Sequence, residues 1–354
     1  MRRSAGITPC LIDQANCRMP FGTTLVSRLQ LRRTPSIRHR RRCVARHVAI
    51  GSVPSSNRLR KQAREFRCFA RQTLPYDQFE VIVVYNCDRK DFRDAALLAC
   101  AKYPGLTIRY QTVHRPGRAA ALNDGVALAR APLIALIADD ALITPSSLAA
   151  TLAYHHRNPD PLAVSIGPTV FTEALRADPL RHWLVDSGVQ FGVCLRQQFT
   201  IWNKQFFFSG NSCVKRALFD NIGLFNEAFP WITWDDYEFG PRLAAAGGYS
   251  QLLSGALAWH DHYVSFDERT GAMRQGGHAA FIHEQMGAAT RPWQLMLDSA
   301  ARLRNTVLPT DDATLTLPQR VPIFKAHFDR AFLEGYEAEA RGNRGDLATL
   351  IGPS

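Results

Sequence analysis

The feature that most constrains this fold is a regular alternation of apolar runs and helix-like segments that starts near residue 47. Four runs read as strands and four segments read as helices: 47–53, 79–85, 106–110 and 132–138, then 58–72, 91–103, 117–129 and a segment from 144. Strand–helix alternation at this spacing predicts right-handed crossovers and a parallel sheet with helices on both faces. We therefore expect an α/β domain whose ligands bind beyond the carboxyl ends of the strands.

Polar residues follow the predicted strands at those ends. Asp139 and Asp140 follow the strand at 132–138, and Asn86 follows the strand at 79–85. Two adjacent carboxylates repel each other, which favours a cation beside them. Mg²⁺ typically takes one or two carboxylates and completes its shell with substrate phosphates and water, and Mn²⁺ suits the same ligands. The pair predicts a divalent-metal site, with a solvated acidic helix start as the alternative.

A second acidic cluster opens a predicted helix at 235–246. Asp235, Asp236 and Glu238 place three carboxylates within four residues. One of them can act as a general base, and Glu238 can pair with Arg242 one turn later. The alternative is an ordinary acidic helix N-terminus.

Two histidines follow an apolar run that ends at Trp259. His260 and His262 are two residues apart, so on a strand both point to the same side. Such a pair can bind a metal ion, and surface histidines are the alternative.

The net charge of +12 is concentrated in an N-terminal arm. Residues 1–47 contain eleven arginines and one acid, Asp13, so the remainder is close to neutral. We expect residues 1–47 to be a disordered arm or an extension outside the working protein. The near-neutral remainder and the absence of a recognition motif argue against nucleic-acid binding as the main function.

The cysteines and the apolar runs bear on location. The eight cysteines are scattered without C-x-x-C or zinc spacing, which is typical of reduced thiols in a cytosolic protein. No apolar run reaches the roughly 18–20 residues of a membrane span, and the arginine-rich start has no apolar core of a secretory signal. We expect a cytoplasmic protein, with peripheral contact to the inner face of a membrane through the basic arm as a further option.

Several short motifs, in order along residues 48–265, resemble the family 2 glycosyltransferases, an inverting family. The motifs lie at Val53–Arg58, Gln72–Val84, Arg115–Gly125, Leu136–Asp140, Phe208–Asn211, Ile222–Glu227 and Asp235–Asp236. This resemblance implies a GT-A fold, a Rossmann-like and mostly parallel sheet flanked by helices. The expected organisation is the arm at 1–47, the GT-A domain at 48–265 and a mainly helical C-terminal extension at 266–354.

The resemblance also implies roles for individual residues. Asp140 is expected to bind the metal ion, Mn²⁺ or Mg²⁺, with His260 as a further ligand. Asp236 is expected to be the catalytic base. Donor contacts are expected from Pro54, Ser55, Asn57, Asn86, Arg118, Asn123 and Asp139, with Asp139 at the ribose and Arg118 at the diphosphate. Candidates for the acceptor side are Trp234, Asp235, Gly210 and Asn211.

The chain departs from the family pattern at one informative place. Tyr85 and Asn86 stand where the family usually carries an aspartate that reads the nucleobase. An amide both donates and accepts hydrogen bonds, so Asn86 can still read a base edge. The predicted partners are a nucleoside-diphosphate sugar and a hydroxyl acceptor such as a saccharide, a lipid-linked glycan or a small molecule. The alternatives are a decayed GT-A scaffold that acts as a binding protein, and a nucleic-acid-binding protein that uses the arginine arm.

Overall fold

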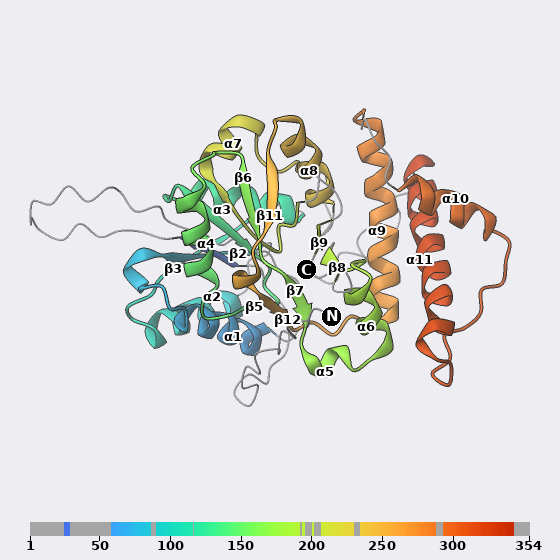
Figure 1. Cartoon of the computed structure of the whole chain (residues 1–354), viewed down its shortest axis with the longest axis horizontal. Coiled ribbons are helices and arrows are strands. Elements are labelled where there is room, and N and C mark those ends of the chain that lie inside the picture. Colours follow the sequence, from blue (N-terminus) through green and yellow to red (C-terminus); the bar gives the residue numbers. More distant parts are fainter. Residues whose placement is uncertain are drawn as a thin grey trace, which may run out of the picture.

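The computed structural model describes residues 25–28, 58–85, 90–115, 117–191, 193–194, 200–201, 207–229, 234–287 and 293–342. Its main element is a seven-stranded sheet in the order β11-β6-β10-β4-β1-β2-β3 (Figure 1). The strands are β1 (Leu25–Arg28), β2 (Glu80–Tyr85), β3 (Thr107–Thr112), β4 (Leu133–Ile137), β6 (Ala163–Ile166), β10 (Asn211–Lys215) and β11 (Tyr249–Leu252).

Five of these strands share one direction. β2 and β3 pair in parallel, as do β6 and β11, whereas β1 and β10 run antiparallel to their neighbours. The carboxyl ends of β2, β4 and β6 therefore meet at one edge of the sheet, as the alternation predicts.

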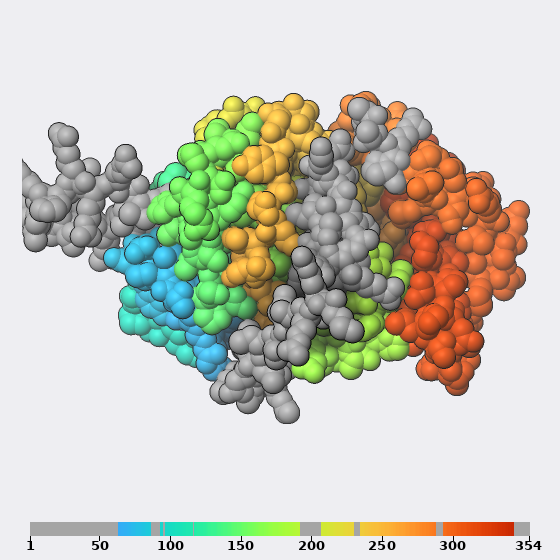
Figure 2. All heavy atoms as spheres, viewed as in Figure 1, coloured from blue at the N-terminus to red at the C-terminus, as the bar shows by residue number. Residues whose placement is uncertain are grey.

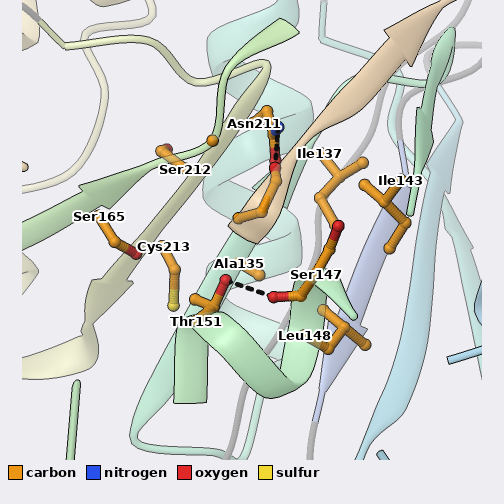
Figure 3. Close-up of a pocket in the computed structure, with 12 residues that line it drawn as sticks. Ala135, Ile137, Ile143, Ser147, Leu148, Thr151, Ser165, Asn211, Ser212 and Cys213 are labelled. Carbon is orange, nitrogen blue, oxygen red and sulfur yellow. Dashed lines mark hydrogen bonds between the residues drawn. The ribbon is translucent and has the colours of Figure 1, made fainter. Parts of the chain in front are cut away.

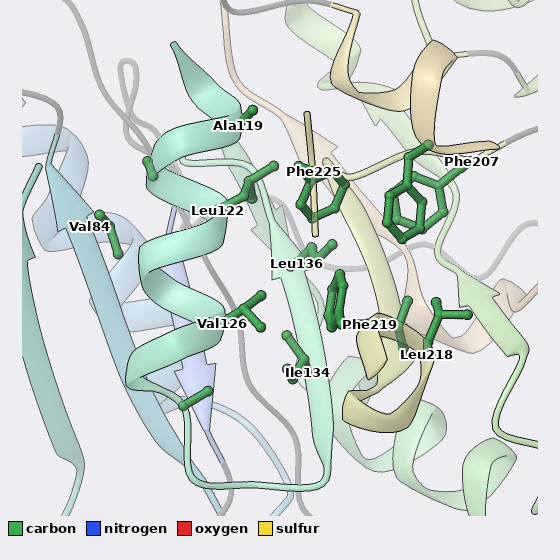
Figure 4. Packing of buried hydrophobic residues seen from close by; sticks show 14 of the residues in the cluster. Val84, Ala119, Leu122, Val126, Ile134, Leu136, Phe207, Leu218, Phe219 and Phe225 are labelled. Carbon is green, nitrogen blue, oxygen red and sulfur yellow. The ribbon is translucent and has the colours of Figure 1, made fainter. Parts of the chain in front are cut away.

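In the described part of the chain, six helices cover the two faces of this sheet: α1 (Arg58–Ala70), α2 (Lys90–Lys102), α3 (Arg118–Leu128), α4 (Ser147–Arg157), α7 (Arg216–Ile222) and α8 (Asp235–Ala245). Two others, α5 (Glu173–Arg176) and α6 (Pro179–Asp186), pack against the strand Thr169–Phe171 and the C-terminal helices instead. Short 3-10 turns lie at Tyr76–Gln78 and Ser254–Ala256. Because side chains alternate along a strand, β2 sends Val81 and Val83 toward α1, α2 and α4, and Ile82 and Val84 toward α3, α7 and α8. Figure 4 shows the second of these layers, where phenylalanines of the 207–225 region pack against α3 and β4.

A smaller sheet lies beside the end of β4. It joins β5 (Ala141–Ile143), β12 (Ala258–His260) and β7 (Thr169–Phe171), with β12 in the middle. A two-stranded ribbon of β8 (Val193–Cys194) and β9 (Thr200–Ile201) lies apart from it. Two apolar runs, at 163–170 and 251–259, are each divided between the large and the small sheet.

The C-terminal region is helical, as expected. It contains α9 (Phe266–Gln285), α10 (Gln294–Arg302) and α11 (Leu317–Ala340). α9 and α11 pack closely because Gly277 has no side chain. A Cβ at this position would overlap the backbone carbonyl oxygen of Phe332. In Figure 2 these helices, orange and red, form one end of the molecule, next to the green surface of α6. No helix among the described residues is both long and apolar enough to cross a bilayer.

The N-terminal segment differs from expectation in one respect. Residues 1–47 were predicted to be an arm outside the fold, but Leu25–Arg28 forms β1 between β2 and β4. A strand at this position satisfies backbone N–H and C=O groups of both neighbours that would otherwise be unpaired inside the sheet. The predicted strand at 47–53 lies outside the described residues.

Candidate active site

The strand-end acids lie where β4 passes into β5. Asp139 and Asp140 occupy a tight turn in which the Ala141 amide donates to the Ala138 carbonyl oxygen at 2.9 Å. The Ala138 amide donates to the Gly210 carbonyl oxygen at 2.7 Å, which fixes this turn against the start of β10. Both carboxylates are only partly buried. The turn therefore presents two acids beyond the end of β4, as predicted.

His260 comes to Asp140 through the small sheet. β12 pairs with β5 so that His260 lies opposite Ala141, and its Nε2 is 3.2 Å from an Asp140 carboxylate oxygen. Phe171 and Phe191 hold the imidazole edge-on, each with its ring centre 5.0 Å away. His262 is also close, with its Nδ1 3.7 Å from the same Asp140 oxygen. The sequence-predicted metal ligands Asp140 and His260 are thus brought together.

The donor atoms at this point suit a divalent cation. Two ligands at right angles around one ion, each about 2.1 Å from it, lie about 3 Å apart, close to the Asp140–His260 spacing. The buried Nδ1 of His260 has no hydrogen-bond partner within the described residues, so no protein contact there fixes its tautomer. Within the same residues no trio of His, Cys, Asp or Glu has metal-site spacing. The protein would supply two ligands, which leaves positions for phosphate and water.

The second acid pair opens α8 from a constrained backbone. Trp234, directly before it, has φ = 85° and ψ = −17°, and it is the single non-glycine residue with positive φ among those described. This conformation costs on the order of 1–3 kcal/mol and persists where surrounding packing enforces it. Here the turn at Trp234 directs both Asp235 and Asp236 toward Ser209.

The Asp235 carboxylate is buried and paired with a cation of the protein. Its side chain is 3% exposed and its Oδ2 lies 2.6 Å from an Arg118 guanidinium nitrogen. The Ser209 hydroxyl, which also contacts Arg118, donates to the same Asp235 oxygen at 2.7 Å. A buried carboxylate is tolerated where a cation and a hydroxyl donor both contact it. Asp235, predicted as an acceptor-side residue, is therefore part of the support of the site in this geometry.

Asp236 has a different environment. One carboxylate oxygen accepts a 2.8 Å hydrogen bond from the Ser209 amide, and the Ser209 hydroxyl also interacts with this carboxylate. Burial raises the pKa of Asp236 to about 7, helped by the neighbouring charge of Asp235, while Arg118 and Ser209 work in the opposite direction. A carboxyl group that titrates near neutral pH can accept a proton and release it again.

Arg118 connects the two acid pairs. It is the first residue of α3, and Gly117 before it adopts φ = 92°, a conformation that glycine reaches without strain. Burial works to lower the pKa of Arg118, but four surrounding carboxylates outweigh it and raise that pKa: Asp235, Asp236, Asp139 and Asp140. The guanidinium was predicted to face a diphosphate. It contacts Asp235 directly and interacts electrostatically with Asp139 and Asp140 at longer range.

Asn123 holds a neighbouring loop. Its side-chain amide donates to the Phe225 carbonyl oxygen at 2.9 Å and to Glu227 at 2.8 Å, and its oxygen accepts from the Phe225 amide at 3.0 Å. Arg115 adds a 2.8 Å ion pair with Glu227 and a 2.6 Å pair with Asp124. Three hydrogen bonds thus occupy the Asn123 side chain, so the structure gives this predicted donor contact a supporting position.

Asn211 and Gly210 lie at the start of β10. The Asn211 side chain is buried and donates to the carbonyl oxygens of Ala256 at 2.8 Å and Pro168 at 3.4 Å. A Cβ at Gly210 would collide with the Phe208 ring. Both predicted acceptor-side residues are used to join the two sheets in this structure.

A small internal cavity lies between β4, β10 and α4 (Figure 3). Its lining is polar, with side chains from Ser147, Thr151, Ser165 and Ser212. The volume open to the centre of a water-sized sphere is about 10 Å³. That is close to the minimum for one water molecule. The cavity is too small for a sugar or a nucleotide, so it does not form the active site.

Trp234 is a core residue. It is 5% exposed, and its ring lies among Tyr237, Trp293 and Phe332, with centre distances of 5.0, 5.4 and 6.2 Å. Its indole N–H donates to His283 of α9 at 3.2 Å. The ring proposed for sugar stacking is therefore enclosed by the C-terminal helices. The remaining predicted donor residues, Pro54, Ser55, Asn57 and Asn86, lie outside the described residues.

Two supporting contacts were missed from the sequence. Ser209 binds both acids of the α8 pair, and although it lies within the Phe208–Asn211 motif, no role was assigned to it. Arg64, 2% exposed, donates to Asp261 at 2.5 Å, and the Asp261 amide donates to the Asp140 carbonyl oxygen at 3.0 Å. Burial raises the pKa of Asp261, although Arg64 opposes that rise. The only sequence signal for this pair is that Asp261 lies between the two histidines.

Comparison with known proteins finds a family match for part of the chain. Residues 53–224 match the family described as Glycosyl transferase family 2. Two curated relatives are validoxylamine A glucosyltransferases from Streptomyces hygroscopicus, subspecies jinggangensis and limoneus. Each is 27% identical over 230 residues, which cover 57% of this chain and 53% and 49% of the relatives. The chain thus spans about half the length of the curated relatives it matches.

Solved structures with similar folds are more distant. A mannosyltransferase from Pyrobaculum calidifontis, in complex with GDP-Man and Mn²⁺, has a TM-score of 0.47 at 18% identity, over 86% of this chain and 75% of that chain. TarS from S. aureus has a TM-score of 0.44 at 15% identity, over 83% and 55%. The predicted α/β class with a helical C-terminal region is confirmed by the structure itself. The motifs and the family match agree: residues 53–224 of this chain are similar to the family 2 glycosyltransferases.

Proposed function

We propose that this protein transfers a sugar from a nucleoside-diphosphate donor to a hydroxyl acceptor, by a metal-assisted single displacement that inverts the anomeric centre. The observation that carries the proposal is the arrangement of two acid pairs around Arg118. One pair is partly exposed beside two histidines, and the other contains a carboxyl group with a pKa of about 7.

The strand-end pair is the donor side of the proposal. Asp140 and His260 would hold Mn²⁺ or Mg²⁺, which would neutralise the charge of the departing diphosphate. Asp139, in the same turn, would contact the donor ribose. A nucleotide at the carboxyl ends of β2 and β4 lies where α/β sheets generally bind such ligands.

The α8 pair is the acceptor side of the proposal. The acceptor hydroxyl loses its proton to the Asp236 carboxylate as its oxygen bonds to the anomeric carbon. The bond from that carbon to the diphosphate oxygen breaks at the same time, so the configuration inverts. The Ser209 amide orients Asp236, while Arg118 and the Ser209 hydroxyl hold Asp235 in place beside it. The Asp235 charge in turn keeps Asp236 basic enough to take the proton.

Nucleotide binding tests the donor side. We expect calorimetric titration of UDP, GDP and dTDP to show one that binds the full chain with Mn²⁺ and binds far more weakly without it. Asp140→Ala should remove the metal-dependent binding, whereas Asp298→Asn, an exposed acid on α10, should leave it unchanged. Binding of none of the three under any condition would favour the alternative of a decayed scaffold.

The stereochemistry tests the displacement. With an α-linked donor sugar, NMR of the product should show a β linkage. An α-linked product would contradict a single displacement and the role given to Asp236.

A further inference from the structure

Among the described residues, Arg269 of α9 is a cation without an acidic partner. One of its terminal nitrogens donates to the Gln190 side chain and the other to the Val189 carbonyl oxygen, both at 3.2 Å. Its Nε is enclosed and has no hydrogen-bond partner within the described residues. No carboxylate in that part of the chain lies within ion-pair distance of it, in contrast to Arg274 five residues later, which pairs with Glu334 at 2.7 Å.

The neighbouring acids do not neutralise Arg269. Glu268 beside it accepts from the Ser265 amide at 2.8 Å and faces His262 at 3.7 Å. The stretches 195–199, 202–206 and 230–233, which the structure does not describe, contain no Asp or Glu. Burial lowers the pKa of Arg269, and Tyr237 is the group that opposes this. A guanidinium that is desolvated without a counter-charge is costly, which makes the position a good one for an anion from outside the chain.

Tyr237 places this cation on the acceptor side. It directly follows Asp236, and its ring stacks on Trp234 at 5.0 Å with planes 24° apart. Protein atoms around Tyr237 raise its pKa, yet 58% of its surface is exposed. It is thus an aromatic surface next to the proposed base. The Trp234 ring on which it stacks would lie 3.6 Å from a Cβ at Gly276 of α9, two helical turns after Arg269, and Tyr237 influences the electrostatic environment of Arg269. Exposed aromatic rings of this kind offer an apolar face and a polar edge to a ligand.

We propose that Tyr237 and Arg269 form an acceptor subsite for a sugar that carries an anionic group, a carboxylate or a phosphate. The sugar ring lies on Tyr237, the anion pairs with the Arg269 guanidinium, and the reacting hydroxyl faces Asp236. This inference rests on the proposed function for the identity of the acceptor, but the anion preference itself is a binding property. Guanidinium pairs well with both anions because its planar donors match their oxygens.

The test measures binding of three matched probes to the full chain by saturation-transfer NMR: glucose, glucuronate and glucose 6-phosphate. We expect at least one anionic probe to bind about tenfold or more tightly than glucose, as a charge-assisted hydrogen bond implies. A preference for glucuronate alone identifies a carboxylate ligand, and one for glucose 6-phosphate alone identifies a phosphate. Equal binding of all three probes overturns the proposal.

Variants assign the preference to Arg269. Arg269→Gln should abolish it, Arg269→Lys should keep part of it, and the control Arg274→Gln should keep all of it. A preference that survives Arg269→Gln, when thermal melting shows the variant folded, overturns the proposal. Arg269→Gln should also leave nucleoside-diphosphate affinity within about twofold, because a larger loss would place the guanidinium at the donor.

The two proposals can fail separately. Wild-type protein that binds no nucleoside diphosphate but still prefers the anionic probes contradicts the proposed transferase function and supports the subsite. Metal-dependent nucleotide binding without any anion preference supports the function and overturns the subsite.

Discussion

The two acid pairs of this protein are alike in sequence and opposite in environment. Asp139 and Asp140 lie in a partly exposed turn beside two histidines, and they act on Arg118 at longer range. Asp235 is buried and contacts Arg118 directly, with Asp236 beside it. The difference shows how the same residue type can serve two purposes: a partly exposed pair beside histidines suits a metal ion, and a buried pair with one acid held by a cation suits proton transfer by the other.

Replacing the proposed base tests this contrast most severely. Asp236→Asn preserves shape and the hydrogen bond from the Ser209 amide but cannot accept a proton. We expect kcat to fall by about 10²–10⁴-fold, the usual contribution of a general base, while metal-dependent nucleotide affinity stays within a few-fold. Steady-state kinetics and calorimetry measure the two quantities. Loss of nucleotide binding with kcat preserved would reverse the roles given to the two pairs.

The same variant has a predictable effect on stability. The pKa of Asp236 is raised in the folded state, from an ordinary value of 3.8 to about 7, so ionisation at higher pH opposes folding. The contribution of Asp236 to the free energy of unfolding is therefore fully present below about pH 4, and it is lost progressively as the pH rises to 7. Denaturant unfolding should therefore show that Asp236→Asn becomes more stable relative to wild type across that interval. A constant difference between pH 4 and pH 8 would contradict the raised pKa.

The next test acts on the helices that hold the α8 pair. A Cβ at Gly277 would overlap the backbone of Phe332, so Gly277→Ala must separate α9 from α11, on which the packing around Trp234 depends. We expect a loss of about 1–3 kcal/mol in the free energy of unfolding, as overpacking generally causes, together with lower kcat. The matched control is Gly271→Ala on the same helix, where a Cβ meets nothing within 4 Å. It should stabilise the protein by up to about 1 kcal/mol.

The two pairs also differ in how much of them the sequence could predict. The strand-end pair follows from local pattern, because all five residues of β4 are buried and the acids come directly after them. The α8 pair was found as an acidic helix start, but its neutralisation was not, since Arg118 lies 117 residues before Asp235. The division of runs 163–170 and 251–259 between two sheets was missed for a similar reason. Strand pairing across the sequence decides it, and a continuous apolar run carries no sign of where one sheet ends.

The fate of the predicted site residues shows the same limit. A motif indicates that Asn123, Asn211 and Trp234 matter, but it does not distinguish contact with a ligand from support of the site. In the structure the polar atoms of all three side chains bind protein groups, and Trp234 does so through helices that follow it in the chain. Burial by later segments has no local sequence signal, so the sequence alone does not distinguish an enclosed tryptophan from an exposed one.

The pH dependence of the reaction separates the pairs by titration. Asp236 must be ionised to accept a proton, and burial raises its pKa to about 7. We expect kcat/KM to fall about tenfold for each pH unit below that value and to level off above it. Initial rates between pH 5 and pH 9 at saturating Mn²⁺ measure this. If kcat/KM fell only below about pH 4, Asp236 would not be the titrating base. The same conclusion would follow if Asp236→Asn, measured at higher enzyme concentration, kept the wild-type fall of kcat/KM at acidic pH.

The smallest expected effect belongs to the single hydrogen bond that ties the α8 pair to the C-terminal helices. Trp234→Phe keeps an aromatic ring among Tyr237, Trp293 and Phe332 but removes the indole N–H that donates to His283. The lost hydrogen bond and the smaller ring should together reduce the free energy of unfolding by about 1–2 kcal/mol. If Trp234 orients Asp236, kcat should fall several-fold while nucleotide affinity and acceptor KM stay constant. If Trp234 instead contacted the acceptor, KM would rise and kcat would change little. The ratio of these two effects therefore decides whether the C-terminal helices only stabilise the fold or also position the base, and it does so without disturbing the metal-binding pair on the other side of Arg118.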